Sequence, residues 1–214
     1  MPCRPMPTVT FCANGGKRSE PVDQPLSKAA VAAQYFLYFG VMGLYLPYFN
    51  LYCYHLGFSG LQIGILSALR SLTMVIFPMV WGALADRTRG RRPIYILCNA
   101  ASAAAWGLFL FTENVAAMAW ITVGYGIFYA PIISFLEAIT MERLGREKKS
   151  YGRVRLWGSI GFITVVLAFG RLIELFSARV IVAGILVGSL LLALIAASVP
   201  RDHRPSSSPR GRGA

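Results

Sequence analysis

Residues that commonly hold metal ions are scarce in this sequence. Its 214 residues include two histidines, His55 and His203, and four cysteines. No two cysteines have the C-x-x-C spacing that is typical of zinc and redox sites, and nothing in their placement indicates a disulfide framework. The two histidines stand far apart in the chain. We therefore expect no metal site and no cofactor.

Charged side chains are also few, and acidic ones are the fewest. Charged residues make up 14% of the chain, with 9 Asp and Glu against 21 Lys and Arg, whereas a soluble domain carries about 25%. A net charge of +12 would indicate nucleic-acid binding in a soluble protein. Here the basic residues lie between long apolar runs, so we interpret them as topology signals and expect no nucleic-acid partner.

Catalytic patterns are missing from the apolar runs as well. The runs contain no paired carboxylates, no histidine cluster and no combination of a nucleophile with a base. Such groups are what an uncharacterised active site is first recognised by. We therefore predict that the chain is not an enzyme.

What the sequence has instead is hydrophobic length. Crossing a hydrocarbon core of about 30 Å takes about 20 apolar residues, and six stretches reach that length. This predicts an all-α integral membrane protein. The polar segment 1–28, which has no signal-peptide pattern, and the Pro-, Ser- and Arg-containing tail 200–214 are predicted to be disordered. The predicted bundle covers 29–199, with spans 29–54, 61–85, 93–111, 115–141, 156–173 and 180–199.

The positions of the lysines and arginines predict the orientation. Eighteen of them lie in the N-terminal segment, the second–third loop, the fourth–fifth loop and the tail. Only Arg171 and Arg179 lie at the loops on the other side. Because loops rich in Lys and Arg stay in the cytoplasm, both termini are predicted to be cytoplasmic. The expected location is the plasma membrane, the inner membrane of a bacterial cell.

A row of polar and aromatic residues follows the first span at helical spacing. Gln34, Tyr38, Tyr45 and Tyr48 share one face. Tyrosines near the ends of a span are typical of the interfacial aromatic belt, but Tyr45 lies in the middle, where its hydroxyl needs a polar partner. The row therefore predicts a face toward a polar interior or cavity, and we assign these four residues to substrate binding.

One arginine lies inside a predicted span. Arg70 is about nine residues into the second span, which at 1.5 Å per residue is about 13 Å deep. A charge at that depth is costly and usually faces a partner or a water-filled path. We assign Arg70 to a substrate-binding or counter-charge role that favours anionic solutes. The alternative is an arginine that snorkels to the interface or pairs two helices.

An acid and a base are predicted to meet between the fourth and fifth spans. Glu137 lies near the cytoplasmic end of the fourth span, and Arg155 lies at the start of the fifth on the same side. A carboxylate that pairs with an arginine changes its affinity for protons when the arginine moves. Proton-coupled transport needs this chemistry, although a static ion pair between two helices is an equally good interpretation.

The first and fourth spans share a short pattern. "LYLPYFN" at 44–50 resembles "FYAPIIS" at 128–134. Each segment lies in the opening helix of a three-helix unit, and because three spans invert the direction of the chain, the two units have opposite topology. Inverted three-helix repeats are the construction principle of many carriers. Glycines in the spans are expected to permit close helix approach. They are Gly40, Gly43, Gly124, Gly126, Gly158 and Gly161.

The loop after the second span has a specific pattern. "GALADRTRGRR" at 82–92 resembles the signature loop of the major facilitator superfamily, with one residue more than usual between its aspartate and glycine. "YGRVRLWGSIGF" at 151–162 is similar to the fifth helix of the branch with lactose permease, phenylpropionate permease and the nucleoside–proton symporters. The matching loop residues are Gly82, Asp86, Arg87, Gly90, Arg91 and Arg92.

The resemblance implies a fold of twelve helices in two six-helix halves, with substrate bound between the halves at mid-membrane and alternating access. It implies that Asp86 contacts the second half, while Arg87, Arg91 and Arg92 stabilise the inward-closed state. It also implies that Glu137 and Arg155 correspond to an acid–arginine pair in sugar-transporting relatives. The given sequence reaches only the sixth span. We therefore expect half of a truncated or split carrier, with a C-terminal six-helix half or a second copy as its partner.

These observations predict a proton-coupled symporter for a small organic solute, such as a sugar, a nucleoside or an aromatic acid. The bilayer, the solute and the proton are its expected partners. The alternative is a six-helix membrane protein that does not transport, either a truncated product or a regulatory scaffold for a full-length relative.

Overall fold

The computed structural model of the chain describes residues 25–87, 91–144 and 148–198. Within these ranges every regular element is a helix, and six spans are long and apolar enough to cross a membrane. The prediction of an all-α protein with six spans is thereby confirmed. The elements are α1 (Pro25–Tyr45), α2 (Tyr48–His55), α3 (Gly60–Arg87), α4 (Arg91–Gly107), η1 (Leu108–Phe111), α5 (Val115–Leu144), α6 (Lys148–Leu175) and α7 (Arg179–Ser198).

The two ends of the chain were predicted to be disordered. Residues 1–24 and 199–214 lie outside the described residues. Helix α1 begins at Pro25, so the last four residues of the predicted segment 1–28 are helical. Proline is well suited to the first turn of a helix, because the N–H it lacks would have no intrahelical partner there.

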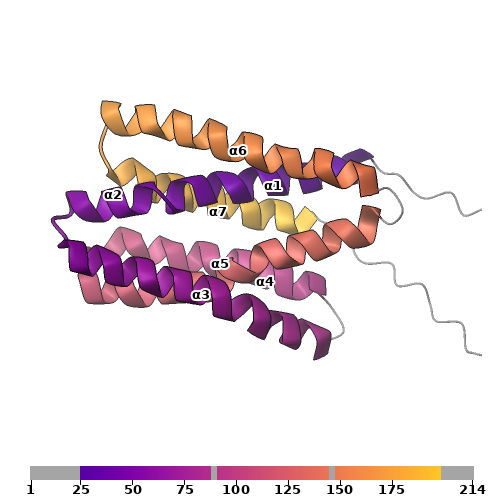
Figure 1. Ribbon diagram of the computed structural model, residues 1–214, viewed down its shortest axis with the longest axis horizontal. Coiled ribbons are helices and arrows are strands. Elements are labelled where there is room, and N and C mark those ends of the chain that lie inside the picture. Colours follow the sequence, from indigo (N-terminus) through magenta and orange to yellow (C-terminus); the bar gives the residue numbers. More distant parts are fainter. Residues whose placement is uncertain (1–24, 88–90, 145–147, 199–214) are drawn as a thin grey trace, which may run out of the picture.

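The spans form a bundle of roughly parallel and antiparallel helices (Figure 1). The start of α1 and the end of α7 lie at the same end of the bundle, which we call the terminal end, and the turns after α2, η1 and α6 lie at the opposite end. The first span, Ala29–His55, is made of α1 and α2 together. The third span, Arg91–Phe111, is made of α4 and η1.

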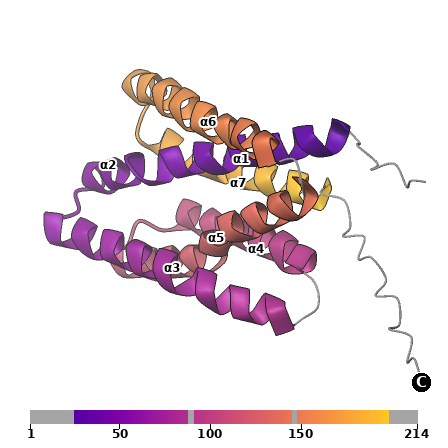
Figure 2. The ribbon, with the colours of Figure 1, turned by 45° about the vertical axis from the view of Figure 1, so that its right-hand side comes forward.

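The helices form two groups of three, which both ribbon views show (Figures 1 and 2). Helix α1 packs along α6 and α7, and α5 packs along α3 and α4. The groups meet mainly where α4 contacts α7. Exchanging α1 with α5, α3 with α6 and α4 with α7 reproduces the same set of contacts, as expected for two inverted three-helix repeats.

Glycines permit the closest helix contacts. A Cβ on Gly161 of α6 would lie 2.9 Å from the carbonyl carbon of Phe36 in α1. A Cβ on Gly126 of α5 would lie 2.7 Å from Cβ of Thr73 in α3. The two helix pairs are equivalent under the exchange of repeats, although the glycine belongs to the outer helix α6 in one pair and to the central helix α5 in the other. Gly124, which the sequence placed in the same class, has open space around it.

Burial differs strongly among the spans. Half of the most apolar 18-residue window is buried in the first span and in α5, against 11% in α3 and 11% in α6. Helix α1 and helix α5 therefore form the centre of the bundle, while α3 and α6 lie at its sides. Large apolar side chains stay exposed along α3, as expected for a surface in contact with lipid or with another membrane helix. They include Leu72, Val75 and Met79.

The prolines act differently in the two repeats. Pro47 separates α1 from α2, whereas Pro131 lies inside α5 without ending it. A proline inside a helix removes one hydrogen bond and clashes with the preceding turn, so neighbouring groups must satisfy the backbone that it frees. At Pro47 an arginine of α3 contacts the carbonyls of the two residues before the proline, and this side chain is part of the candidate site.

Candidate functional site

Three of the four residues in the polar row of α1 lie inside the bundle. Gln34 and Tyr45 are fully buried, and Tyr38 is 2% exposed. Gln34 donates a hydrogen bond to the carbonyl of Leu192 in α7 (3.1 Å), and Tyr95 of α4 donates one to Oε1 of Gln34 (2.9 Å). The expectation of a polar interior fits Gln34. A side chain enclosed by α4 and α7 does not reach a solute in this conformation.

The tyrosines of the row pack in an aromatic cluster. The ring of Tyr38 stacks on Tyr129 of α5 at 5.0 Å between centroids, and Tyr45 makes edge contacts with Tyr125 at 5.1 Å and with Trp106 at 5.4 Å. These packed rings join α1 to α4 and α5. The sequence analysis missed Tyr125, Tyr129 and Trp106, although the i, i+4 spacing of the two tyrosines was a usable signal.

The fourth residue of the row has a different environment. Tyr48 of α2 is half-buried and donates a hydrogen bond to the carbonyl of Val166 in α6 (2.9 Å). A Cβ on Gly170 would lie 2.9 Å from the Tyr48 hydroxyl, so the absence of a side chain there leaves room for it. Tyr48 therefore connects the segment after Pro47 to α6 through a hydrogen bond.

Arg70 contacts the same helix break from α3. Its Nη1 donates to the carbonyls of Tyr45 (3.0 Å) and Leu46 (3.4 Å), and its guanidinium carbon lies 5.2 Å from the centre of the Tyr45 ring. The last carbonyls of a helix have no partner within the helix. Arg70 satisfies those at the end of α1, which supports the interpretation of Arg70 as a helix-joining arginine in this conformation.

Two polar residues beside Arg70 were not found from the sequence. Ser67, one turn earlier on α3, donates a hydrogen bond to Oδ1 of Asn50 in α2 (3.2 Å). Both side chains are partly exposed. These two residues and Arg70 lie on the side of the α1–α2 break that faces α3, and Tyr48 contacts α6 from the same break. We call the four residues the break cluster.

Glu137 of α5 and Arg155 of α6 form an ion pair between Oε1 and Nη1. Their side chains are 40% and 44% exposed, so the pair is partly open. Nη1 of Arg155 also lies 3.4 Å from the hydroxyl of Tyr151, and its guanidinium carbon lies 5.6 Å from the centre of the Phe39 ring in α1. One acid and one base thus meet where α1, α5 and α6 come together.

The residues of the signature loop lie at the terminal end. Asp86 and Arg87 end α3, and Arg91 and Arg92 begin α4. Nη2 of Arg91 lies 3.7 Å from Oδ1 of Asp86, and Nη2 of Arg92 donates to the carbonyl of Ala197 at the end of α7 (3.0 Å). Gly90 lies outside the described residues, and Gly82 has open space around it.

The charged residues of this loop therefore make two kinds of contact. The Asp86–Arg91 contact spans the turn from α3 to α4, while the Arg92 contact places a cation at the negative end of the α7 dipole, where it is stabilising. The Asp86 side chain remains 74% exposed. It is accessible to another element at the terminal end.

The predicted residues thus fall into separate groups rather than one site. The break cluster holds Arg70 and Tyr48, the ion pair holds Glu137 and Arg155, and the signature residues lie at the terminal end. Residues Gln34, Tyr38 and Tyr45 belong to the core. Among the described residues, no group of three or more His, Cys, Asp or Glu side chains is placed to hold a metal ion.

Comparison with known proteins identifies the family to which the chain belongs and a solved structure with a similar fold. The family model described as "MFS_1 like family" matches residues 29–207. The chain is 28% identical to the "Probable 3-phenylpropionic acid transporter" of Escherichia coli (strain K12), covering 85% of this chain and 46% of that protein. It is also 28% identical to the maltose permease of Geobacillus stearothermophilus, covering 78% and 43%.

A solved structure shows the same arrangement of helices. The crystal structure of the nucleoside transporter NupG matches with a TM-score of 0.74 and 22% identity, covering 82% of this chain and 44% of that one. The chain therefore has the fold of half of such a transporter. It spans about half the length of the curated relatives it matches.

Proposed function

Because the chain belongs to the MFS_1 like family of transporters, we propose that it forms one six-span unit of a proton-coupled carrier for a small organic solute. Members of the family are carriers rather than enzymes, in agreement with the prediction from the sequence. The observation that carries the proposal is the partly exposed Glu137–Arg155 pair, which places an acid and a base between two spans. A moving arginine changes the proton affinity of such a carboxylate.

The solute class is inferred from the relatives and from the break cluster. The names of the matched proteins specify an aromatic acid, a disaccharide and nucleosides. Tyr48 and Arg70 supply a hydroxyl and a cation that a sugar, a nucleoside or an aromatic acid can contact. Buried Gln34, Tyr38 and Tyr45 then act indirectly, because they position α1.

Transport by alternating access needs a second six-span unit, either a C-terminal half or a second copy of the chain. Exposed apolar side chains along α3 and an exposed Asp86 suit contact with such a unit. In this arrangement Arg87, Arg91 and Arg92 hold the terminal end closed. The competing proposal is a six-span protein that does not transport.

Uptake measurements decide between the two proposals. The chain would be reconstituted in vesicles alone and together with the C-terminal six-span half of a relative, with a labelled sugar, nucleoside or aromatic acid outside. A gradient of one pH unit is expected to drive about tenfold accumulation of one class, because it supplies about 1.4 kcal/mol per proton. No accumulation of any class, alone or with the second half, would favour the non-transporting protein.

Arg70→Ala is expected to weaken uptake of an anionic solute more than uptake of a neutral one. A charge-assisted hydrogen bond is worth about 1.5–3 kcal/mol, so the apparent affinity for the anion should fall about tenfold or more. Arg171→Ala is the matched control, because that arginine is 83% exposed at the end of α6. Equal losses for both solutes would leave Arg70 as a residue that only supports the α1–α2 break.

We also propose that the terminal end faces the cytoplasm. In a variant whose Cys3 and Cys12 are replaced by serine, Ser177→Cys, in the turn between α6 and α7, should react with a membrane-impermeant maleimide in intact cells. Arg87→Cys, at the end of α3, should react only after lysis. Cys53 and Cys98 are buried, so the background should be low. The reverse pattern of labelling would overturn the orientation.

A further inference from the structure

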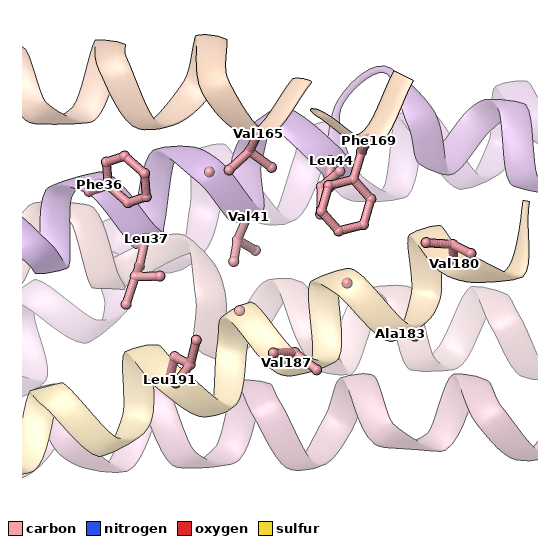
Figure 3. A pocket seen from close by; sticks show the side chains of 13 residues that line it. Phe36, Leu37, Val41, Leu44, Val165, Phe169, Val180, Ala183, Val187 and Leu191 are labelled. Atoms are coloured by element: carbon pink, nitrogen blue, oxygen red, sulfur yellow. The ribbon is translucent and has the colours of Figure 1, made fainter. Parts of the chain in front are cut away.

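A groove opens between α6 and α7, with α1 behind it in the view of Figure 3. It holds a cavity of about 330 Å³, which is within the size range of small-molecule sites. Every residue that lines it is apolar or a glycine. Phe36 and Leu37 lie toward the terminal end, Val180 lies at the opposite end, and Val187 forms part of the α7 wall.

Two glycines of α7 line the groove and let neighbouring side chains pack close to the helix backbone. A Cβ on Gly188 would lie 2.6 Å from Cγ2 of Val41, and a Cβ on Gly184 would lie 2.5 Å from Cζ of Phe169. Helix α7 therefore lies close against α1 and Phe169, while α6 and α7 make few contacts with each other. The space between α6 and α7 stays open toward the outside of the bundle.

The groove has the dimensions and surroundings of a lipid chain. On α7 its lining runs from Val180 to Leu191, which at 1.5 Å per residue is about 16 Å. That is about half of a hydrocarbon core of about 30 Å, or one leaflet. Both walls belong to candidate membrane spans, so hydrocarbon is the surrounding solvent. A flexible chain that lies along the helices restores dispersion contacts that an empty groove would lack.

Two cations stand close in sequence to residues that line the groove: Arg179 precedes Val180, and Arg171 follows Phe169 by two residues. Arg171 on α6 and Arg179 on α7 are 83% and 80% exposed. Each also pairs with an acid, Arg171 with Glu174 at 3.1 Å and Arg179 with Glu113 at 3.3 Å. A guanidinium has five N–H donors, so each arginine has donors beyond its ion pair. The planar guanidinium matches the geometry of a phosphate.

We propose that this groove binds one acyl chain of a phospholipid from the leaflet opposite the terminal end, with the lipid phosphate held at Arg171 and Arg179. The site is distinct from the residues that we propose for solute transport. It lies on α6, α7 and one side of α1, whereas the Glu137–Arg155 pair and the break cluster involve other contacts.

Photolabelling of the chain in a bilayer tests the proposal. The protein would be reconstituted in phosphatidylethanolamine vesicles that contain a small share of the same lipid with a diazirine at the end of one acyl chain, and cross-linked residues would be mapped by mass spectrometry. Labelling of Leu37, Val187 and Leu191 should exceed labelling of Leu190 and Leu194 by about tenfold, a preference of about 1.4 kcal/mol. Even labelling of all five would show only an unspecific lipid shell and overturn the proposal.

Groove-filling variants provide the second readout. Ala183 lines the groove, and Ala104 is an exposed alanine on α4 outside it. Ala183→Phe should abolish the preferential labelling, whereas Ala104→Phe should retain it. Replacing Arg171 and Arg179 together by glutamine should lower labelling in the groove severalfold. Unchanged labelling in Ala183→Phe, or equal losses in both alanine variants, would contradict an acyl-chain site.

Discussion

Glu137→Gln is expected to abolish uphill accumulation of the solute while leaving solute exchange intact. Glutamine keeps the size and the hydrogen-bonding capacity of the glutamate side chain, but its amide neither binds nor releases a proton at the pH of a transport assay. A carrier without this proton-binding group cannot use a gradient of one pH unit to accumulate the solute about tenfold. Exchange needs only the movement of loaded carrier between its two states, so it should continue.

The structure provides a close control for this variant. Glu174→Gln also removes an acid that pairs with an arginine on α6. That pair lies at the opposite end of the helix, and the Glu174 side chain is 67% exposed. It should accumulate solute like the unchanged protein. Both variants would be measured in the same vesicles, with and without a pH gradient. If Glu137→Gln retained pH-driven accumulation, the pair would be a static ion pair between α5 and α6.

Gly161→Ala is expected to destabilise the bundle more than other small changes in the spans. The new methyl group would lie 2.9 Å from the carbonyl carbon of Phe36 and closer still to its oxygen. These atoms belong to the backbone, so no side-chain rotation relieves the clash and α1 must move away from α6. Overpacking of this kind costs about 1–3 kcal/mol. Unfolding by titration with sodium dodecyl sulfate would measure the loss.

Gly124→Ala is the matched control. It makes the same substitution within a membrane span, but a Cβ on Gly124 has no neighbour within 4 Å. Alanine also has a higher helix propensity than glycine by about 1 kcal/mol, so the free energy of unfolding should stay the same or rise. A similar destabilisation in both variants would mean that the close approach of α1 and α6 does not depend on Gly161.

The two predictions concern the same part of the molecule. A Cβ on Gly158 would lie 2.5 Å from Cδ2 of Phe39, and Phe39 is the ring that the Arg155 guanidinium faces. The closeness of α1 and α6 therefore sets the position of the arginine that pairs with Glu137. A change that separates these helices should disturb the ion pair as well as stability.

The number of spans and the contact between Glu137 and Arg155 were predictable from the sequence. Hydrophobic length is a local property, because a segment in hydrocarbon must satisfy its backbone within its own helix. Depth in the membrane is also local, since it follows from the residue count along each span. Two side chains at similar depth on consecutive spans were therefore correctly placed together.

Tertiary structure decided what each face of a helix meets. Helical periodicity correctly grouped Gln34, Tyr38 and Tyr45 on one side of α1, yet it does not specify which helices cover that side. In the folded chain α4, α5 and α7 cover it, so the row became the core rather than a cavity wall. Arg70 likewise contacts carbonyls that only a break at Pro47 exposes. Such contacts depend on non-local packing, because the helices that meet are far apart along the chain.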